Sequence, residues 1–168
     1  MRIFALGLLL FSVGAGAQTI VLVRHAEKAD APKDDPALSE AGQRRAQALA
    51  VALKRSNVTA VYTTQLRRTQ ETAAPLATAA GVTPRVLTVA RGGVAEHVAE
   101  AVKLAREKPD GVVVIVGHSN TVPAIARALG ADAADMPECE YSRLITLLPG
   151  LPARTIVARY GEPDGACP

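Results

Sequence analysis

The stretch TIVLVRHAEKAD, residues 19–30, decides the fold because an apolar run ends abruptly in charged residues. Residues 20–23 contain only Ile, Val and Leu, which is typical of a strand buried inside a sheet. Arg24 and His25 follow directly, although such side chains rarely enter an apolar core. We therefore expect a buried strand over residues 19–23 whose carboxyl end delivers a functional group.

The composition describes one globular domain and argues against nucleic-acid binding. The 168 residues suffice for a sizeable core, since 49% of them are hydrophobic and 21% charged. The net charge is only +3, and the basic residues are scattered along the chain. Aromatic residues make up 3% of the chain and Trp is absent, so a base-stacking platform is not expected.

The N-terminus has the pattern of an export signal. Arg2 precedes an apolar stretch over residues 3–13, which is too short to span a bilayer as a helix. The small residues AGA at 15–17 fit a signal-peptidase site. We predict a signal peptide over residues 1–17, a mature domain over residues 18–168, a periplasmic or secreted location and no stable membrane span after cleavage. A retained anchor and a buried first strand are the alternatives.

Strand-like and helix-like stretches alternate through the rest of the chain. Their apolar periodicity and Gly and Pro breaks predict strands at 19–23, 58–62, 84–89, 112–116, 143–148 and 154–160, and helices at 40–55, 65–80, 94–108 and 121–129. This alternation predicts a three-layer α/β sandwich, with a mostly parallel central sheet flanked by helices and a C-terminal strand pair. We place His97, which lies within a helix and has no evident partner, on the surface.

Ligands of such sheets bind beyond the carboxyl ends of the strands. Arg24 and His25 end the first strand, and His118 follows the run at residues 112–116. Arg67 and Arg68 open the helix that follows the second strand. If these strands are neighbours, two imidazoles and several guanidinium groups meet at one edge.

Such a cluster suits phosphoryl transfer. Guanidinium groups match the oxygens of phosphate in bidentate fashion, and they stabilise the charge that spreads over a transferring phosphoryl group. A neutral imidazole can attack phosphorus and form a covalent phosphohistidine. Neighbouring arginines disfavour a second positive charge and so keep that imidazole unprotonated.

Three segments resemble the motifs of the histidine phosphatase superfamily, also called the phosphoglycerate mutase-like family. They occur in the family's order and spacing: VRHAEK at residues 23–28, TTQLRRTQETA at 63–73 and VVIVGHSNTV at 113–122. The resemblance extends from about residue 19 to residue 160. It implies a phosphomonoester hydrolase that needs neither metal nor cofactor.

The resemblance also implies a role for each matching residue. His25 corresponds to the nucleophile, and Arg24 and Arg68 correspond to the phosphate-binding arginines. His118 corresponds to the second imidazole of the pocket. Only the motif selects Arg68 over Arg67, because both lie off the apolar stripe of their helix.

The chain departs from the family pattern at positions that bear on the proton donor. Ala26 stands where Gly is usual, and Ala31 stands where mutases have Asn, which makes mutase activity less expected. Ser119 replaces the Asp that serves as general acid in the acid-phosphatase branch. Glu96 and Glu27 are then the candidate donors, each with the alternative of being a solvated carboxylate.

Ser119 and Asn120 are candidate phosphate contacts because they begin a helix, where side chains and backbone N–H groups can meet an anion. The sequence GHSNT also approximates the nucleophile elbow of α/β-hydrolases. That alternative is disfavoured because Thr121 stands in place of the last Gly and no His follows Ser119.

Cys139 and Cys167 are the two cysteines of a chain that we expect to be exported. They lie before one strand and after its neighbour, and these ends of an antiparallel pair come close together. We predict a disulfide, with two free thiols as the alternative. No Cys-x-x-Cys or His-rich cluster indicates a metal site.

The sequence predicts only the general class of molecule that the protein binds. We expect a phosphorylated small molecule or an envelope phosphomonoester, and no nucleic acid. A non-catalytic module that binds a phosphate ligand in the same fold is the alternative function.

Overall fold

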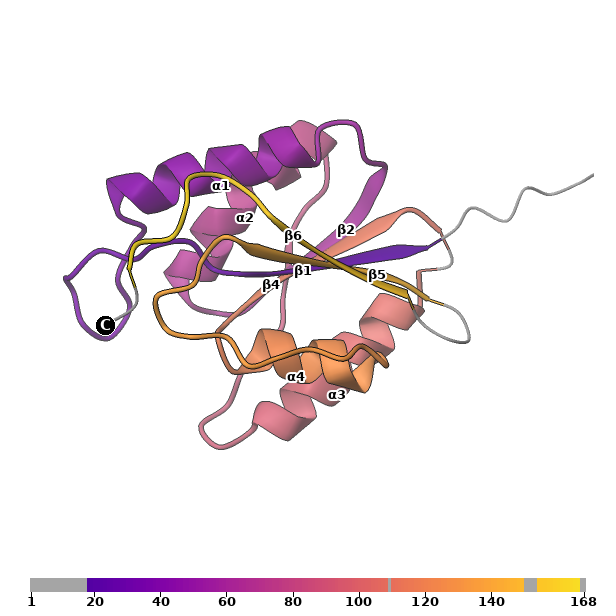
Figure 1. Ribbon diagram of the computed structural model, residues 1–168. Coiled ribbons are helices and arrows are strands. Elements are labelled where there is room, and N and C mark those ends of the chain that lie inside the picture. The colour runs from indigo at the N-terminus through magenta and orange to yellow at the C-terminus, as the bar shows by residue number, and fades with distance from the viewer. Residues whose placement is uncertain (1–17, 109, 150–153, 167–168) are drawn as a thin grey trace, which may run out of the picture.

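The computed structural model describes residues 18–108, 110–149 and 154–166 (Figure 1). These residues form a six-stranded sheet in the order β3-β2-β4-β1-β5-β6. The strands are β1 (Thr19–Arg24), β2 (Val58–Thr63), β3 (Arg85–Val86), β4 (Val112–Gly117), β5 (Arg143–Leu148) and β6 (Arg154–Arg159). The predicted signal peptide, residues 1–17, lies outside the described residues.

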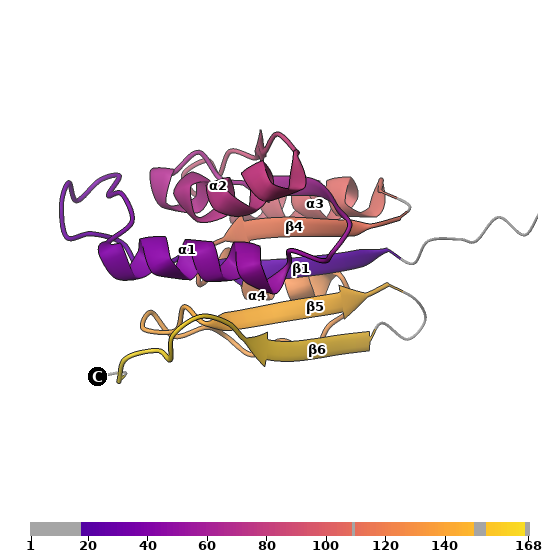
Figure 2. The ribbon, with the colours of Figure 1, turned by 90° about the horizontal axis from the view of Figure 1, so that it is seen from above.

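The sheet is parallel except for its last two strands. β1 pairs in parallel with β4, which pairs in parallel with β2, and β2 with β3. β5 runs antiparallel to β1, and β6 antiparallel to β5. Seen from above, β5 and β6 lie side by side beyond β1 (Figure 2). The predicted mostly parallel sheet with a C-terminal strand pair is confirmed.

Helices cover both faces of the sheet, as predicted. α1 (Glu40–Ala52) and α2 (Arg67–Ala80) lie on one face, and α3 (Val94–Arg106) and α4 (Thr121–Ala128) on the other (Figure 1). Alternate residues of β1 serve the two faces, because side chains of a strand point in opposite directions in turn. Ile20 and Leu22 belong to the core under α3 and α4, whereas Val21 and Val23 belong to the core under α1 and α2. Within the described residues, no helix has the length and apolar character needed to cross a membrane.

His97 is buried, so the prediction of a surface position is wrong. Its exposed fraction is 3%, and neither ring nitrogen has a hydrogen-bond partner among the described residues. Ala101, Leu104 and Ala105 are the other buried residues of α3. Positions 97, 101, 104 and 105 form one helical stripe, so the same periodicity that buries Leu104 also buries the imidazole.

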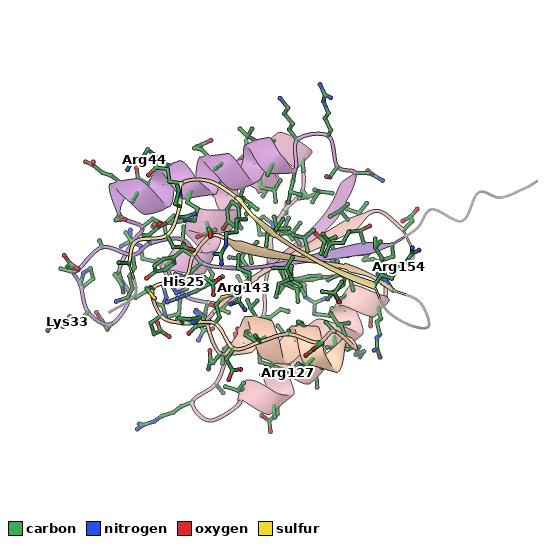
Figure 3. All side chains as sticks on the ribbon, viewed as in Figure 1. His25, Lys33, Arg44, Arg127, Arg143 and Arg154 are labelled. Atoms are coloured by element: carbon green, nitrogen blue, oxygen red, sulfur yellow. The ribbon has the colours of Figure 1, made fainter. Side chains whose placement is uncertain are left out.

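The strand order brings the predicted functional ends together. Arg24 at the end of β1 lies beside Gly117 at the end of β4. Since β5 is antiparallel to β1, Val23 pairs with Leu144, and the chain that leads into β5 reaches the same edge. Figure 3 shows His25 and Arg143 at this edge and Arg154 at the opposite one.

Candidate active site

A pocket of about 490 Å³ opens at the carboxyl ends of the parallel strands. The sequence predicted six residues for such a pocket, and the structure places all of them in its lining: Arg24, His25, Arg68, His118, Ser119 and Asn120. They come from the ends of β1 and β4 and from the N-terminal turns of α2 and α4.

His25 is held as a neutral imidazole with one nitrogen uncommitted. It is 4% exposed, and its backbone N–H donates to the carbonyl of Gly117 at 2.9 Å, which extends the β1–β4 ladder. Its Nδ1 lies 2.8 Å from the carbonyl oxygen of Ala26. A carbonyl oxygen only accepts, so Nδ1 carries the proton and the lone pair lies on Nε2.

The surroundings of His25 disfavour its protonation. Burial lowers its pKa to about 3, with further lowering by Arg24, His118 and Arg68, while the hydrogen bond to Ala26 acts in the opposite direction. The imidazole of His118 lies edge-on, with the two ring centroids 5.4 Å apart. A neutral nucleophile therefore coexists with an electropositive pocket.

Arg24 is buried to 1% exposure and is fixed by the loop between α4 and β5. Its Nη1 donates to the carbonyl oxygens of Pro137, Glu138 and Glu140 at 2.9, 2.7 and 3.2 Å. Its guanidinium carbon lies 4.3 Å from the centre of the Tyr141 ring, a cation–π contact. The Nε atom has no hydrogen-bond partner in the described structure, so a donor is left for a ligand.

The structure separates the two arginines that helical geometry left equivalent. Arg68 lines the pocket, and its buried Nε lacks any partner among the described residues. Arg67 instead forms an exposed ion pair with Glu71 at 3.0 Å, and its backbone N–H donates to Asp35. Burial lowers the pKa of Arg68 from its usual value, yet a guanidinium remains charged at neutral pH.

His118 is the second imidazole of the pocket and is oriented by a hydroxyl. Its Nε2 lies 3.0 Å from the Thr64 hydroxyl, which lies 3.0 Å from that of Thr69. Burial, followed by Arg68, lowers the pKa of His118 to about 4. Both imidazoles are therefore neutral at pH 7.

The turn between β4 and α4 depends on a glycine. The His118 N–H donates to the Thr121 hydroxyl at 2.9 Å, and a Cβ at Gly117 would lie 2.7 Å from that hydroxyl oxygen. Asn120 is the N-cap of α4 but makes no capping hydrogen bond through its side chain. Ser119 donates to the carboxylate of Glu138 rather than to a histidine.

Neither proton donor predicted from the sequence lines the pocket. The Glu27 carboxylate accepts hydrogen bonds of 2.6–3.0 Å from buried Arg45, which also donates to the carbonyl of Tyr160. This arrangement joins the segment after β1 to the C-terminal segment, and it makes Glu27 part of the scaffold. Glu96 lines a separate cavity with His97. The geometry therefore gives neither carboxylate a route to the reacting atoms.

Two charged residues of the lining, Lys28 and Glu138, were not predicted from the sequence. Glu138 forms an ion pair with Arg24, with 2.7 Å between Oε2 and Nη2. Its position follows from the observed antiparallel pairing of β5 with β1, which the sequence did not predict. A strand antiparallel to β1 must begin near the end of β1, so the residues that precede Arg143 had to approach Arg24.

The predicted disulfide between Cys139 and Cys167 and the expected absence of a metal both remain predictions. Cys139 is not a free thiol, but Cys167 lies outside the described residues, so the bond between them stays a prediction. Over the described ranges, no group of three or more His, Cys, Asp and Glu side chains is arranged to hold a metal ion.

Comparison with known proteins finds a family model that matches part of this chain. The profile of the histidine phosphatase superfamily (branch 1) matches residues 20–91, which include His25 and Arg68. The structure of a putative phosphohistidine phosphatase SixA from Nakamurella multipartitia is similar with a TM-score of 0.59 and 27% identity, over 89% of this chain and 98% of that one. The predicted resemblance to the histidine phosphatase superfamily is confirmed. These similarities support a phosphatase-type function.

One further solved structure and one curated protein are also similar to this chain. The complex of a mycobacterial glucosyl-3-phosphoglycerate phosphatase with inorganic phosphate has a TM-score of 0.62 at 20% identity, over 84% of this chain and 96% of that one. The PE-PGRS family protein PE_PGRS11 of Mycobacterium tuberculosis (strain ATCC 25618 / H37Rv) is 36% identical over 115 residues, or 62% of this chain and 19% of that protein. This chain therefore spans about a fifth of the length of that curated relative.

Proposed function

We propose that the protein hydrolyses phosphomonoesters through a phosphohistidine intermediate on His25. The observation that carries the proposal is the hydrogen bond from His25 Nδ1 to the Ala26 carbonyl, which leaves the Nε2 lone pair free in a pocket with two arginines. Arg24 and Arg68 each retain an unpartnered, buried Nε among the described residues, as an anion site requires.

The proposed reaction has two steps. The Nε2 lone pair of His25 attacks phosphorus, the N–P bond forms, and the ester P–O bond breaks with its electron pair on the leaving oxygen. Water then attacks phosphorus, the N–P bond breaks, and the pair returns to Nε2 as inorganic phosphate leaves. Arg24, Arg68 and neutral His118 stabilise the equatorial oxygens in both steps.

Hydrolysis of p-nitrophenyl phosphate tests this proposal against the non-catalytic alternative. We expect His25→Ala to lower kcat/KM by at least about 10³-fold, because the nucleophile is lost. His97→Leu is the matched control, since it removes a buried histidine that does not line the pocket. An inactive wild type that still binds inorganic phosphate would favour the binding module instead.

We also propose that the reaction needs no metal and that the substrate is a small or envelope phosphomonoester met outside the cytoplasm. The chemistry above uses only imidazole and guanidinium groups, and a pocket of about 490 Å³ suits a small ester. Undiminished turnover after chelation, and a secreted form whose N-terminus is Gln18, are the expected results. Loss of activity with a chelator, or retention of residues 1–17, would contradict them.

A further inference from the structure

Glu138 supplies the only carboxylate among the described residues that line the pocket. It lies in the loop between α4 and β5, and its side chain is 81% exposed. One carboxylate oxygen binds Nη2 of Arg24 at 2.7 Å, and the other accepts a hydrogen bond from the Ser119 hydroxyl. The carboxylate thus occupies a donor of the proposed phosphate site. No other described residue of the lining has a carboxyl group that could act as an acid there.

We propose that Glu138 is the general acid–base of this phosphatase, and that the substrate phosphoryl group takes over the Arg24 donor to which the Glu138 carboxylate is bound. The inference rests on the proposed phosphatase function and goes beyond it by naming the proton donor. Ser119 stands directly after His118, and its hydroxyl holds the Glu138 carboxylate at this end of the pocket.

The loop is built so that the carboxylate can leave Arg24 without the loop leaving the pocket. Nη1 of Arg24 binds three backbone carbonyls of residues 137–140, whereas only Nη2 binds the Glu138 side chain. A phosphoryl group on Nη2 therefore displaces one carboxylate and leaves the backbone anchor intact. The exposed side chain can then turn toward the leaving group while its main chain stays in place.

Binding of the substrate also changes the protonation of Glu138 in the required direction. The Ser119 hydrogen bond and then Arg24 lower the pKa of Glu138, against the raising effect of burial. A phosphoryl dianion bound to the two arginines neutralises their positive charge and places a negative charge beside the Glu138 carboxylate. Both effects raise the pKa of Glu138. Glu138 takes a proton from solvent as the ester binds.

Glu138 passes one proton to the leaving group and recovers one from water. As the P–O bond breaks, the leaving oxygen takes the proton of the Glu138 carboxyl group and departs as an alcohol, which leaves a carboxylate. In the second step, the attacking water gives one proton to that carboxylate while its oxygen bonds to phosphorus. The N–P bond to His25 then breaks, and Glu138 ends the cycle as it was when the ester bound.

The test compares esters that differ in their need for a proton. Glu138→Gln keeps the size of the side chain and an acceptor for Ser119 but cannot donate the carboxyl proton. With an alkyl phosphate, whose leaving alkoxide is unstable, we expect its kcat/KM to fall by about 10²–10⁴-fold. With p-nitrophenyl phosphate, which releases a stable phenolate, we expect a loss of less than about tenfold. Glu96→Gln is the matched control and should leave both values near wild type.

The outcomes separate this inference from the proposed function. An equal loss of kcat/KM with both esters, or no loss with either, would overturn the role of Glu138 as the acid. A rise of kcat/KM with both esters would also overturn it, because Glu138 would then only compete with substrate for Arg24. A wild type that cleaves p-nitrophenyl phosphate but no alkyl phosphate would also overturn it. If wild type and His25→Ala are equally inactive on every ester, the proposed function itself fails. Thermal unfolding of Glu138→Gln should match that of wild type.

Discussion

At the scale of single residues, Arg68 and Arg67 differ in position, and only Arg68 lines the pocket where the phosphate is expected to bind. Arg68→Ala removes an uncommitted guanidinium from the pocket, and we expect kcat/KM to fall by about 10²–10³-fold. Arg67→Ala breaks only an exposed ion pair with Glu71, worth at most about 1 kcal/mol, so its effect should stay below about fivefold. Steady-state kinetics of the two variants check this, and comparable losses would contradict the assignment.

The sequence was sufficient to predict some of these residues and not others, for physical reasons. Arg24 and His25 directly follow the predicted strand over residues 19–23, and His118 comes one glycine after the strand over 112–116. The position of a strand's end therefore also locates these side chains. Glu138 lies in a loop without periodicity, where only the strand topology brings it near Arg24. Glu27 and Glu96 were plausible proton donors from their place in the sequence. In the structure, the Glu27 carboxylate is bound by Arg45, and Glu96 lines a separate cavity.

At the scale of elements, the turn from β4 to α4 sets the position of His118. In Gly117→Ala the new Cβ would lie 2.7 Å from the Thr121 hydroxyl oxygen and 3.1 Å from a methyl group of Val122. We expect a loss of stability of about 1–3 kcal/mol. We also expect kcat/KM to fall up to about 10²-fold, because the hydrogen bond that positions the His118 N–H must shift.

Gly165→Ala is the matched control for that turn, because a Cβ at Gly165 has no neighbour within 4 Å. Denaturant unfolding and steady-state kinetics measure the two effects. A Gly117→Ala variant that is as stable and as active as Gly165→Ala would show that the turn tolerates a side chain and does not constrain His118.

The elements were predicted well where periodicity was strong and poorly where it faded. β5 has the predicted bounds, whereas the predicted helix over residues 40–55 ends at Ala52. The predicted strand over 84–89 shrinks to Arg85–Val86, both exposed at the edge of the sheet, where little apolar burial supports pairing. Helix ends are the least determined by pattern because the last turn lacks part of its hydrogen bonds.

At the scale of the whole molecule, three histidines with lowered pKa values link stability to pH. Their pKa values in the folded protein are lowered, to about 3 for His25 and about 4 for His118, and in the same direction for His97. The unfolded chain therefore binds more protons below about pH 6.5, so stability falls as the pH drops from there toward the folded-state values. Each histidine contributes at most about 1.4 kcal/mol for each pH unit in that window.

His97→Leu isolates one of these contributions outside the pocket. The variant removes two buried nitrogens that lack partners, so it should match or exceed wild type at pH 7. At pH 5 its advantage should grow by as much as about 2 kcal/mol, because only wild type then carries the protonation cost of this residue. Urea unfolding at both pH values measures the difference, and an advantage that shrinks toward pH 5 would contradict the sign.

Trapping the phosphorylated intermediate shows whether His25 carries the phosphoryl group. Wild-type protein is mixed with a radiolabelled aryl phosphate and quenched in alkali, where phosphohistidine survives, and the labelled peptide is then mapped. We predict label on the peptide that contains His25, loss of that label in acid, and none in His25→Ala. Turnover with label on another residue, or undiminished phosphate release by His25→Ala, would contradict the account.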